Sequence, residues 1–299
     1  MAHIFSLAGK HALVTGATTP LARALAVGLA EAGATVSVTT THAVLAEEVE
    51  ANSILNECWA AASTSGQAKT IDLTDPAAVQ AAVAELEAAV APIDILVNAT
   101  HGANIKPTLE ATLADWQTEV DRNATTAFVA CQAVGKGMVA RGRGRIINLV
   151  SVVHDRGVPN CAMFSASQAV GKRMLTRGVG RIINLVSVLE DRGVPNAALF
   201  SASQGAVMSL TRTLAIEWGR GDRSLPRVTV NALGLGFYDG VAGPQGDENL
   251  HAILERYIPL RRLGQPADLQ GAVVYLASDT TNYVQGELLM IDGAIANHA

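Results

Sequence analysis

Apolar residues along this chain form short aliphatic runs that alternate with longer segments of helical spacing. The run HALVT at His11–Thr15 predicts a buried strand, and the apolar positions of Leu21–Ala32 after it lie on one face of a helix. The same alternation continues along the first half of the chain. The predicted strands are His11–Thr15, Thr35–Thr39, Lys69–Asp72, Ile93–Asn98 and Arg145–Ser151. The predicted helices are Leu21–Ala32, Ala43–Cys58, one that begins at Asp75-Pro76, and Leu113–Val139.

Strands that alternate with helices at this pitch indicate βαβ units and therefore an α/β fold with a doubly wound parallel sheet and helices on both faces. Aliphatic runs without internal alternation suit strands that are buried on both faces. No Pro-, Gly- or Ser-rich linker divides the chain, so we expect residues 1–299 to form a single domain.

A direct repeat is the strongest organisational signal. Residues 133–168 (the first repeat segment) recur as residues 169–204 (the second repeat segment), with identical residues at 28 of 36 positions. We interpret this as a tandem duplication of a helix end, a strand, a loop and a helix start. His154 corresponds to Glu190 in the second segment, and Cys161 corresponds to Ala197, so neither side chain is required in both copies.

Composition excludes several classes of function. The net charge is −5 and the longest basic cluster is the short RGRGR at 141–145, so we expect no nucleic-acid partner. The three cysteines show no metal-ligand spacing, and we predict no metal site. No apolar run is long enough to span a bilayer, and the first residues lack the pattern of a signal peptide. We therefore expect no membrane association and a cytoplasmic location.

Several short motifs occur in a fixed order. They are GKHALVTGA, IDLTDP, IDILVN, Asn123 in the long helix, INLVS followed by FSASQ, RVTVNALGLG, and PLRRLGQPADLQGAVVYLASDTTNYVQGELLMIDGA. In this order and spacing they resemble the short-chain dehydrogenase/reductase (SDR) family over nearly the whole chain. The resemblance implies a Rossmann-like fold and assigns expected roles to individual residues.

The resemblance places a dinucleotide at the turn that starts with Thr15-Gly16. Family members have further glycines there, which let backbone N–H groups approach the pyrophosphate at a helix N-terminus. Here Pro20 lacks an N–H and Ala22 adds a methyl group. Gly16 alone suffices for the sharp bend, so the turn either binds pyrophosphate or only joins a strand to a helix.

Further positions after the second, third and fourth strands bear on the cofactor. Thr39-Thr40-Thr41-His42 contains neither the acid of NAD-preferring relatives nor the basic residue of NADP-preferring ones. Asp72 matches the residue that holds adenine, or is an ordinary turn residue. Asn98 matches the family's asparagine after the fourth strand, and His101 replaces a glycine there, either as a filler of the cleft or as a base. These departures predict no NAD(P) binding, or weak binding.

The catalytic set that the resemblance implies is Asn, Ser, Tyr and Lys. Asn123 matches the asparagine. Ser151 in the first repeat segment or Ser187 in the second matches the serine. Which repeat segment occupies the usual place in the sheet is open, and we favour the second, with the first at the sheet edge or against a partner subunit.

The tyrosine and lysine positions depart from the family in both segments. They hold Phe164 and Gln168 in the first segment, and Phe200 and Gln204 in the second. Phenylalanine has no proton to give, and glutamine has no charge with which to lower a pKa. General acid–base catalysis contributes roughly 10²–10⁴ in rate, and these positions cannot supply it.

Three functional hypotheses follow. The first is a non-catalytic SDR subunit that supports an active paralogue in a homo- or hetero-oligomer of SDR-fold subunits, and the sequence favours it. The second is an NAD(P)-dependent oxidoreductase whose proton donor is Tyr238, His101 or His154. The third is a non-redox enzyme that uses Ser187 or His101 in the emptied cleft.

Overall fold

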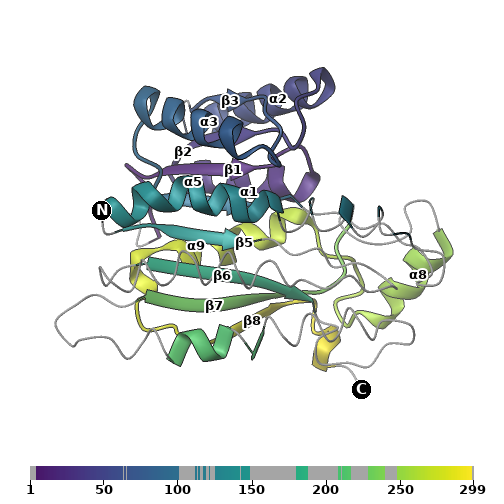
Figure 1. The fold of residues 1–299 in the computed structure, drawn as a ribbon. Helices are drawn as coiled ribbons and strands as arrows, with labels where there is room; N and C mark the ends of the chain where they lie inside the picture. Colours follow the sequence, from purple (N-terminus) through teal and green to yellow (C-terminus); the bar gives the residue numbers. More distant parts are fainter. Residues whose placement is uncertain are drawn as a thin grey trace.

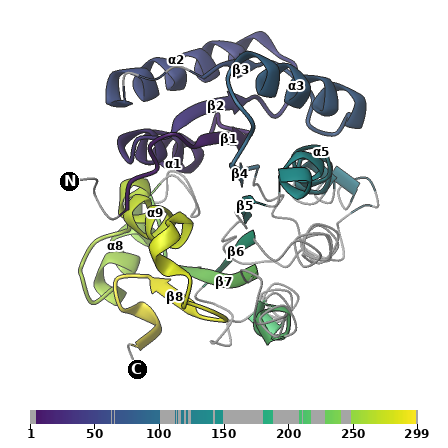
Figure 2. The same ribbon diagram turned by 90° about the vertical axis from the view of Figure 1, so that its left-hand side faces the viewer.

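A computed structural model gives the structure of the chain. It describes residues 5–62, 64, 66–100, 112, 114, 117–118, 121, 125–141, 143–148, 180–187, 208–209, 211–216, 228–239 and 248–297. The described strands form one parallel sheet in the order β3-β2-β1-β4-β5-β6-β7-β8 (Figures 1 and 2). The chain thus has the doubly wound parallel α/β fold that the alternating pattern predicts, and this fold is Rossmann-like, as the family resemblance implies.

The first half follows the predicted order closely. Its elements are β1 (His11–Thr15), α1 (Pro20–Glu31), β2 (Thr35–Thr39), α2 (Leu45–Ala62), β3 (Ala68–Lys69), α3 (Pro76–Ala89), β4 (Ile95–Asn98) and α5 (Thr126–Arg141). Asp75 caps α3, because its carboxylate accepts hydrogen bonds from the N–H groups of Ala77 and Ala78, at 2.8 and 3.3 Å. The strand order reverses at β1, which pairs with β2 on one side and β4 on the other.

The second half completes the sheet. Its elements are β5 (Arg145–Asn148), β6 (Gly180–Ser187), β7 (Val228–Leu235), α8 (Glu248–Tyr257), η3 (Pro266–Leu269), α9 (Gln270–Ala277), η4 (Asp279–Thr281), β8 (Leu288–Ile291) and η5 (Ile295–Asn297). No helix in the described ranges is long and apolar enough to cross a membrane.

Helices cover both faces of the sheet, as Figure 2 shows with the strands seen nearly end-on. On one face α1, α2 and α9 pack through residues such as Leu25, Ile54 and Val273. On the other face α3 and α5 pack through residues such as Val83 and Val134. Every β4 residue is buried, which explains why its sequence reads as an uninterrupted aliphatic run.

The two repeat segments contribute neighbouring strands, which corrects our placement of the first copy. We expected the first copy at the sheet edge or against a partner, but β5 lies between β4 and β6 in mid-sheet. Ile146 pairs with Ile182 and Ile147 with Ile183 in parallel register. All four isoleucines are buried, one pair on each face of the sheet. Burying such a side chain is worth roughly 1.5–3 kcal/mol, and a mid-sheet position achieves this on both faces.

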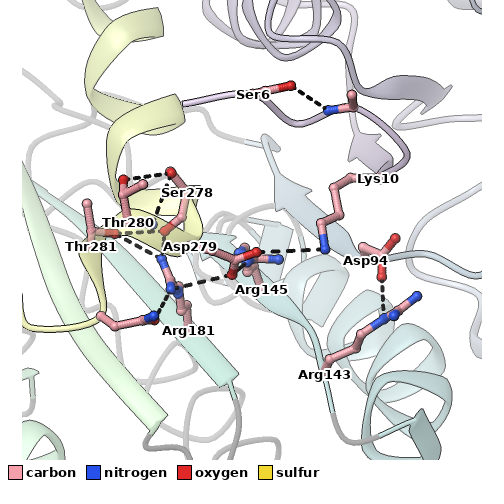
Figure 3. A network of polar contacts seen from close by, with 12 residues as sticks. Ser6, Lys10, Asp94, Arg143, Arg145, Arg181, Ser278, Asp279, Thr280 and Thr281 are labelled. Carbon is pink, nitrogen blue, oxygen red and sulfur yellow. Dashed lines mark hydrogen bonds and ion pairs between the residues drawn. The ribbon is translucent and has the colours of Figure 1, made fainter. Parts of the chain in front are cut away.

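The repeat also places two arginines side by side at the start of β5 and β6 (Figure 3). Arg145 and Arg181 are in register, and each is only 6% exposed. Both form ion pairs with Asp279, as does Lys10, with the N–O separation at 3.7 Å for Arg181 and 4.0 Å for Lys10. Arg181 also donates to Thr281 Oγ1 at 2.9 Å and to the Ser278 carbonyl. One exposed carboxylate therefore serves three cations.

Candidate functional site

The turn between β1 and α1 lies at the point where the strand order reverses, where ligands of doubly wound sheets bind. Gly16 adopts φ +61°, so a residue with a side chain would be strained there. A Cβ at this position would also lie 2.4 Å from Thr100 Cγ2. The bend is anchored to β2, because the Gly16 N–H donates to Thr39 Oγ1 at 3.3 Å and the Ala17 N–H to the Thr39 carbonyl at 2.9 Å.

Pro20 and Ala22, which stand where family members have other residues, are accommodated in this turn and leave its backbone donors accessible. Pro20 occupies the first helical position, where an N–H would have no helical partner. Ala22 is fully buried in the core, and its N–H donates to Thr19 Oγ1 at 3.2 Å. Within the described part of the chain, the backbone N–H groups of Thr18, Thr19 and Leu21 donate to no protein acceptor. The turn thus keeps a set of backbone donors at a helix N-terminus, the donor chemistry that a pyrophosphate requires.

A carboxylate that the sequence analysis missed lies at the end of β2. Glu47, in the first turn of α2, accepts hydrogen bonds from the N–H groups of Thr41 and His42, at 2.6 and 3.0 Å. Its other oxygen lies 2.8 Å from His42 Nδ1. The only sequence signal was an acidic residue at the start of the next helix, because the strand end itself contains no acid.

Asp72 lies on the loop after β3, beside the same strand end. Its Oδ1 accepts from the N–H and the hydroxyl of Thr74, at 2.8 and 2.7 Å, and these bonds lower the pKa of Asp72. The Leu73 N–H donates to the Thr41 carbonyl at 3.1 Å, which fixes this loop against the end of β2. Asp72 is therefore an ionised turn residue next to the strand end.

Asn98 belongs to a buried polar row across the carboxyl ends of the strands. Thr15, Asn98, Asn148 and Asn184 are in register on β1, β4, β5 and β6. Asn98 accepts from Thr15 Oγ1 at 3.2 Å and donates to Asn148 Oδ1 at 2.9 Å and to Cys131 Sγ at 3.2 Å. Burial raises the pKa of Cys131 to about 12, so the thiol stays protonated. The Asn98 side chain thus links the strands that carry the site.

Most of the expected catalytic positions lie outside the described residues. These are Asn123, Ser151, Phe164, Gln168, Phe200 and Gln204, together with His101 and His154. Ser187 is the last residue of β6, where its backbone pairs with Leu235 of β7. The catalytic roles assigned to all of these positions stay predictions.

Tyr238 is not suited to proton transfer. It is 3% exposed, and its hydroxyl donates to the Ile291 carbonyl at 2.7 Å. Burial raises the pKa of this phenol above its ordinary value of 10, because the phenolate would be poorly solvated. This residue fastens the chain after β7 to β8.

The fold and the turn together place the chain among the Rossmann-like, doubly wound α/β proteins, whose ligands bind where the strand order reverses. Among the described residues, no three His, Cys, Asp or Glu side chains gather as a metal site. A family model for short chain dehydrogenases matches residues 10–171, and one for enoyl-(acyl carrier protein) reductases matches residues 162–295. The chain belongs to the short-chain dehydrogenase family.

Named relatives match over nearly the full chain. Gluconate 5-dehydrogenase of Gluconobacter oxydans is 30% identical over 98% of this chain and 96% of its own length. A 2-dehydro-3-deoxy-D-gluconate 5-dehydrogenase of Pseudoalteromonas atlantica is 33% identical over 97% and 96%. The crystal structure of a gluconate 5-dehydrogenase from Burkholderia cenocepacia in complex with NADP and tartrate is similar with a TM-score of 0.72, at 28% identity over 99% and 98%.

These comparisons correct two predictions. The hypothesis of a non-catalytic supporting subunit is wrong, because the relatives that match the whole chain are named as dehydrogenases and reductases. The prediction of absent or weak NAD(P) binding is also wrong, because similar structures contain NADP. The physical reason lies in the turn, where backbone donors and the bend at Gly16 persist without the later glycines.

Proposed function

We propose that this chain is an NAD(P)-dependent oxidoreductase that interconverts a secondary alcohol and a ketone on a sugar acid or sugar alcohol. The observation that carries the proposal is the full-length match to relatives named for gluconate, 2-dehydro-3-deoxy-D-gluconate and threitol. The unpaired N–H groups of Thr18, Thr19 and Leu21 support it, because they suit a pyrophosphate.

In this proposal, separate residues bind the dinucleotide and the substrate. The turn after β1 holds the pyrophosphate, and Asp72 and Asn98 border the bound dinucleotide. When bound, the dinucleotide exchanges a hydride with the carbinol carbon of the substrate. The protein must then accept one proton from the substrate hydroxyl, or return one to the ketone oxygen. Asn123 and Ser187, or Ser151, would hold that oxygen.

The proton donor must differ from the family's tyrosine, since both tyrosine positions hold phenylalanine. Tyr238 is unsuitable for the reasons above, which leaves His101 and His154 of the three side chains considered. His101 follows β4 closely, and the carboxyl ends of parallel strands meet at the ligand-binding edge. An imidazole titrates near pH 6.5 and can both accept and donate a proton. We therefore propose His101 as the donor.

The test is turnover of D-gluconate, 5-ketogluconate, threitol and galactitol with each dinucleotide, followed by absorbance of the reduced nicotinamide. His101→Gln should lower kcat by roughly 10²–10⁴ and abolish the pH dependence near neutrality. His154→Gln is the matched control, because the second repeat segment already has Glu190 at this position. Absence of substrate-dependent turnover across the panel would overturn the proposal, and equal effects of both variants would overturn the choice of His101.

We further propose that the chain forms a homo-oligomer through the surface of the helical residues 211–216. Leu214 and Ala215 are buried, but Ile216 beside them is 57% exposed on the surface of the molecule. Light scattering should show a dimer or larger species at micromolar concentration, and Ile216→Glu should shift it toward monomer. A wild-type protein that is monomeric at that concentration would contradict this proposal.

A further inference from the structure

The carboxylate of Glu47 occupies the end of β2 through three contacts. The two backbone N–H groups of Thr41 and His42 bind one of its oxygens, and the His42 imidazole binds the other. The side chain is 20% exposed, so the carboxylate still meets solvent on one side. Burial alone would raise the pKa of Glu47, but the bonds from His42 and Thr41 outweigh it and lower the pKa. Glu47 is therefore a fixed negative charge at neutral pH.

This charge lies next to the proposed cofactor turn. Thr41 Oγ1 is 3.1 Å from the place where a Cβ on Gly16 would be, so Thr41 packs directly over the bend. Thr39 holds the N–H groups of Gly16 and Ala17 from the same strand end. The segment that Glu47 binds is thus in contact with the turn that has the unpaired donors.

The basic side chains of the flanking elements already have acidic partners. Arg23 of α1 forms ion pairs with Glu50 and Glu57 of α2, at 2.6 Å to Glu50. Lys69 of β3 forms one with Glu85 at 2.7 Å. Asp72 adds a second carboxylate near this strand end, because the Leu73 N–H beside it donates to the Thr41 carbonyl at 3.1 Å. The surroundings of the strand end are therefore acidic overall.

We propose that Glu47 makes this chain select NAD(H) over NADP(H). The inference rests on the proposed function, because it concerns the dinucleotide of that same site. The two dinucleotides differ by one phosphate on the adenosine ribose. At the end of the second strand of such folds, an acid accepts a hydrogen bond from a ribose hydroxyl, whereas a phosphate needs a basic partner. Here the acid comes from α2 instead of from the strand, and it also takes the backbone donors that a phosphate could use.

The selectivity follows from charge. A ribose hydroxyl can donate to a carboxylate, and that pair carries no repulsion. A phosphate at the same strand end carries about two negative charges and is repelled by a carboxylate that its hydrogen bonds hold in place. We expect NADH to bind at least about tenfold more tightly than NADPH. Similar structures contain NADP, so this chain would differ from those relatives.

Calorimetric titration of NADH and NADPH into the wild type, Glu47→Gln and Glu48→Gln tests the inference. Glu48→Gln is the matched control, because this substitution removes the same charge from the neighbouring, exposed position of α2. Glu47→Gln should strengthen NADPH binding about tenfold. The ratio of the dissociation constant for NADPH to that for NADH should therefore fall toward one. Glu48→Gln should leave that ratio near the wild-type value.

The outcomes separate the two proposals. Wild-type protein that binds NADPH as tightly as NADH, or more tightly, overturns the inference about Glu47 and leaves the oxidoreductase intact. An equal change of the ratio in both variants also overturns it, since the effect would then be one of net charge. Wild-type protein that binds neither dinucleotide overturns the proposed function as well. If Glu47→Gln does not fold, the ratio of the wild-type dissociation constants for NADPH and NADH still tests the inference.

Discussion

His11 shows how one buried polar side chain joins β1 to its surroundings. The ring is 1% exposed, with Nδ1 at 2.6 Å from the Ala91 carbonyl and Nε2 at 2.8 Å from Ser37 Oγ. A carbonyl can only accept, so Nδ1 carries the proton and Nε2 accepts from the serine hydroxyl. Burial is the main reason that the pKa of His11 lies below its ordinary value of 6.5. The folded state therefore favours the neutral imidazole over the charged one.

This linkage makes the protein sensitive to acid. Because the folded state binds the proton more weakly than the unfolded state, the stabilisation from neutral His11 is complete above the ordinary pKa of 6.5 and declines as pH falls below it. The free energy of unfolding should fall by up to about 1.4 kcal/mol per pH unit in this range. His11→Gln should remove that part of the slope in denaturant titrations at several pH values. Equal slopes in the two proteins would refute the assignment.

For single residues, the sequence predicted the positions of the candidate residues in the fold. It predicted their contacts less well. Gly16, Asp72 and Asn98 all lie at the carboxyl edge of the sheet, as the strand assignments implied. Glu47 was missed, because its role depends on a helix that returns to the end of the preceding strand. Such a contact is set by the packing of α2 on the sheet and leaves no local pattern.

At the element scale, β1 and β2 match their predicted bounds, while β3 is shorter than predicted. The sequence predicted Lys69–Asp72, but the strand is Ala68–Lys69. The Thr40 hydroxyl explains the difference, since it donates to the Ile71 carbonyl at 3.0 Å and accepts from the Ile71 N–H at 2.9 Å. A side chain replaces the next rung of the ladder, and side-chain competition of this kind cannot be read from hydrophobic spacing.

The adjacent arginines of β5 and β6 give a prediction about the repeat. Burial and the nearby charge of Arg145 lower the pKa of Arg181 to about 10, and Arg145 Nε is buried without a protein partner. Arg145→Met removes one of the two adjacent positive charges. It should therefore lower the free energy of unfolding by less than about 1 kcal/mol, or raise it. Asp279→Asn should destabilise by roughly 1–3 kcal/mol, less than for a fully buried pair because Asp279 is 70% exposed.

Chemical denaturation of both variants beside the wild type provides the measurement. We expect Asp279→Asn to lower the free energy of unfolding more than Arg145→Met does. If Arg145→Met were the more destabilising, Arg145 and not the shared carboxylate would hold the amino end of the two strands together.

At the scale of the whole molecule, the sequence predicted the fold class but not the position of the first repeat strand. Both copies contain the same aliphatic run, so no sequence feature distinguishes a mid-sheet strand from an edge strand. The structure resolves this by burial, since Ile146 and Ile147 of β5 reach both cores. The lost tyrosine and lysine suggested an inactive protein, but they concern proton transfer and leave the backbone donors of the turn unchanged.

Calorimetric titration of NADH into the wild type and Gly16→Val measures whether that turn binds a dinucleotide. Gly16 has positive φ, and a side chain there would clash with Thr100, so the variant should lose the bend and the binding with it. We expect a wild-type dissociation constant below about 0.1 mM, or roughly −5.5 kcal/mol, and at least about tenfold weaker binding by Gly16→Val. A wild-type dissociation constant above about 1 mM, or equal binding by the variant, would contradict this expectation.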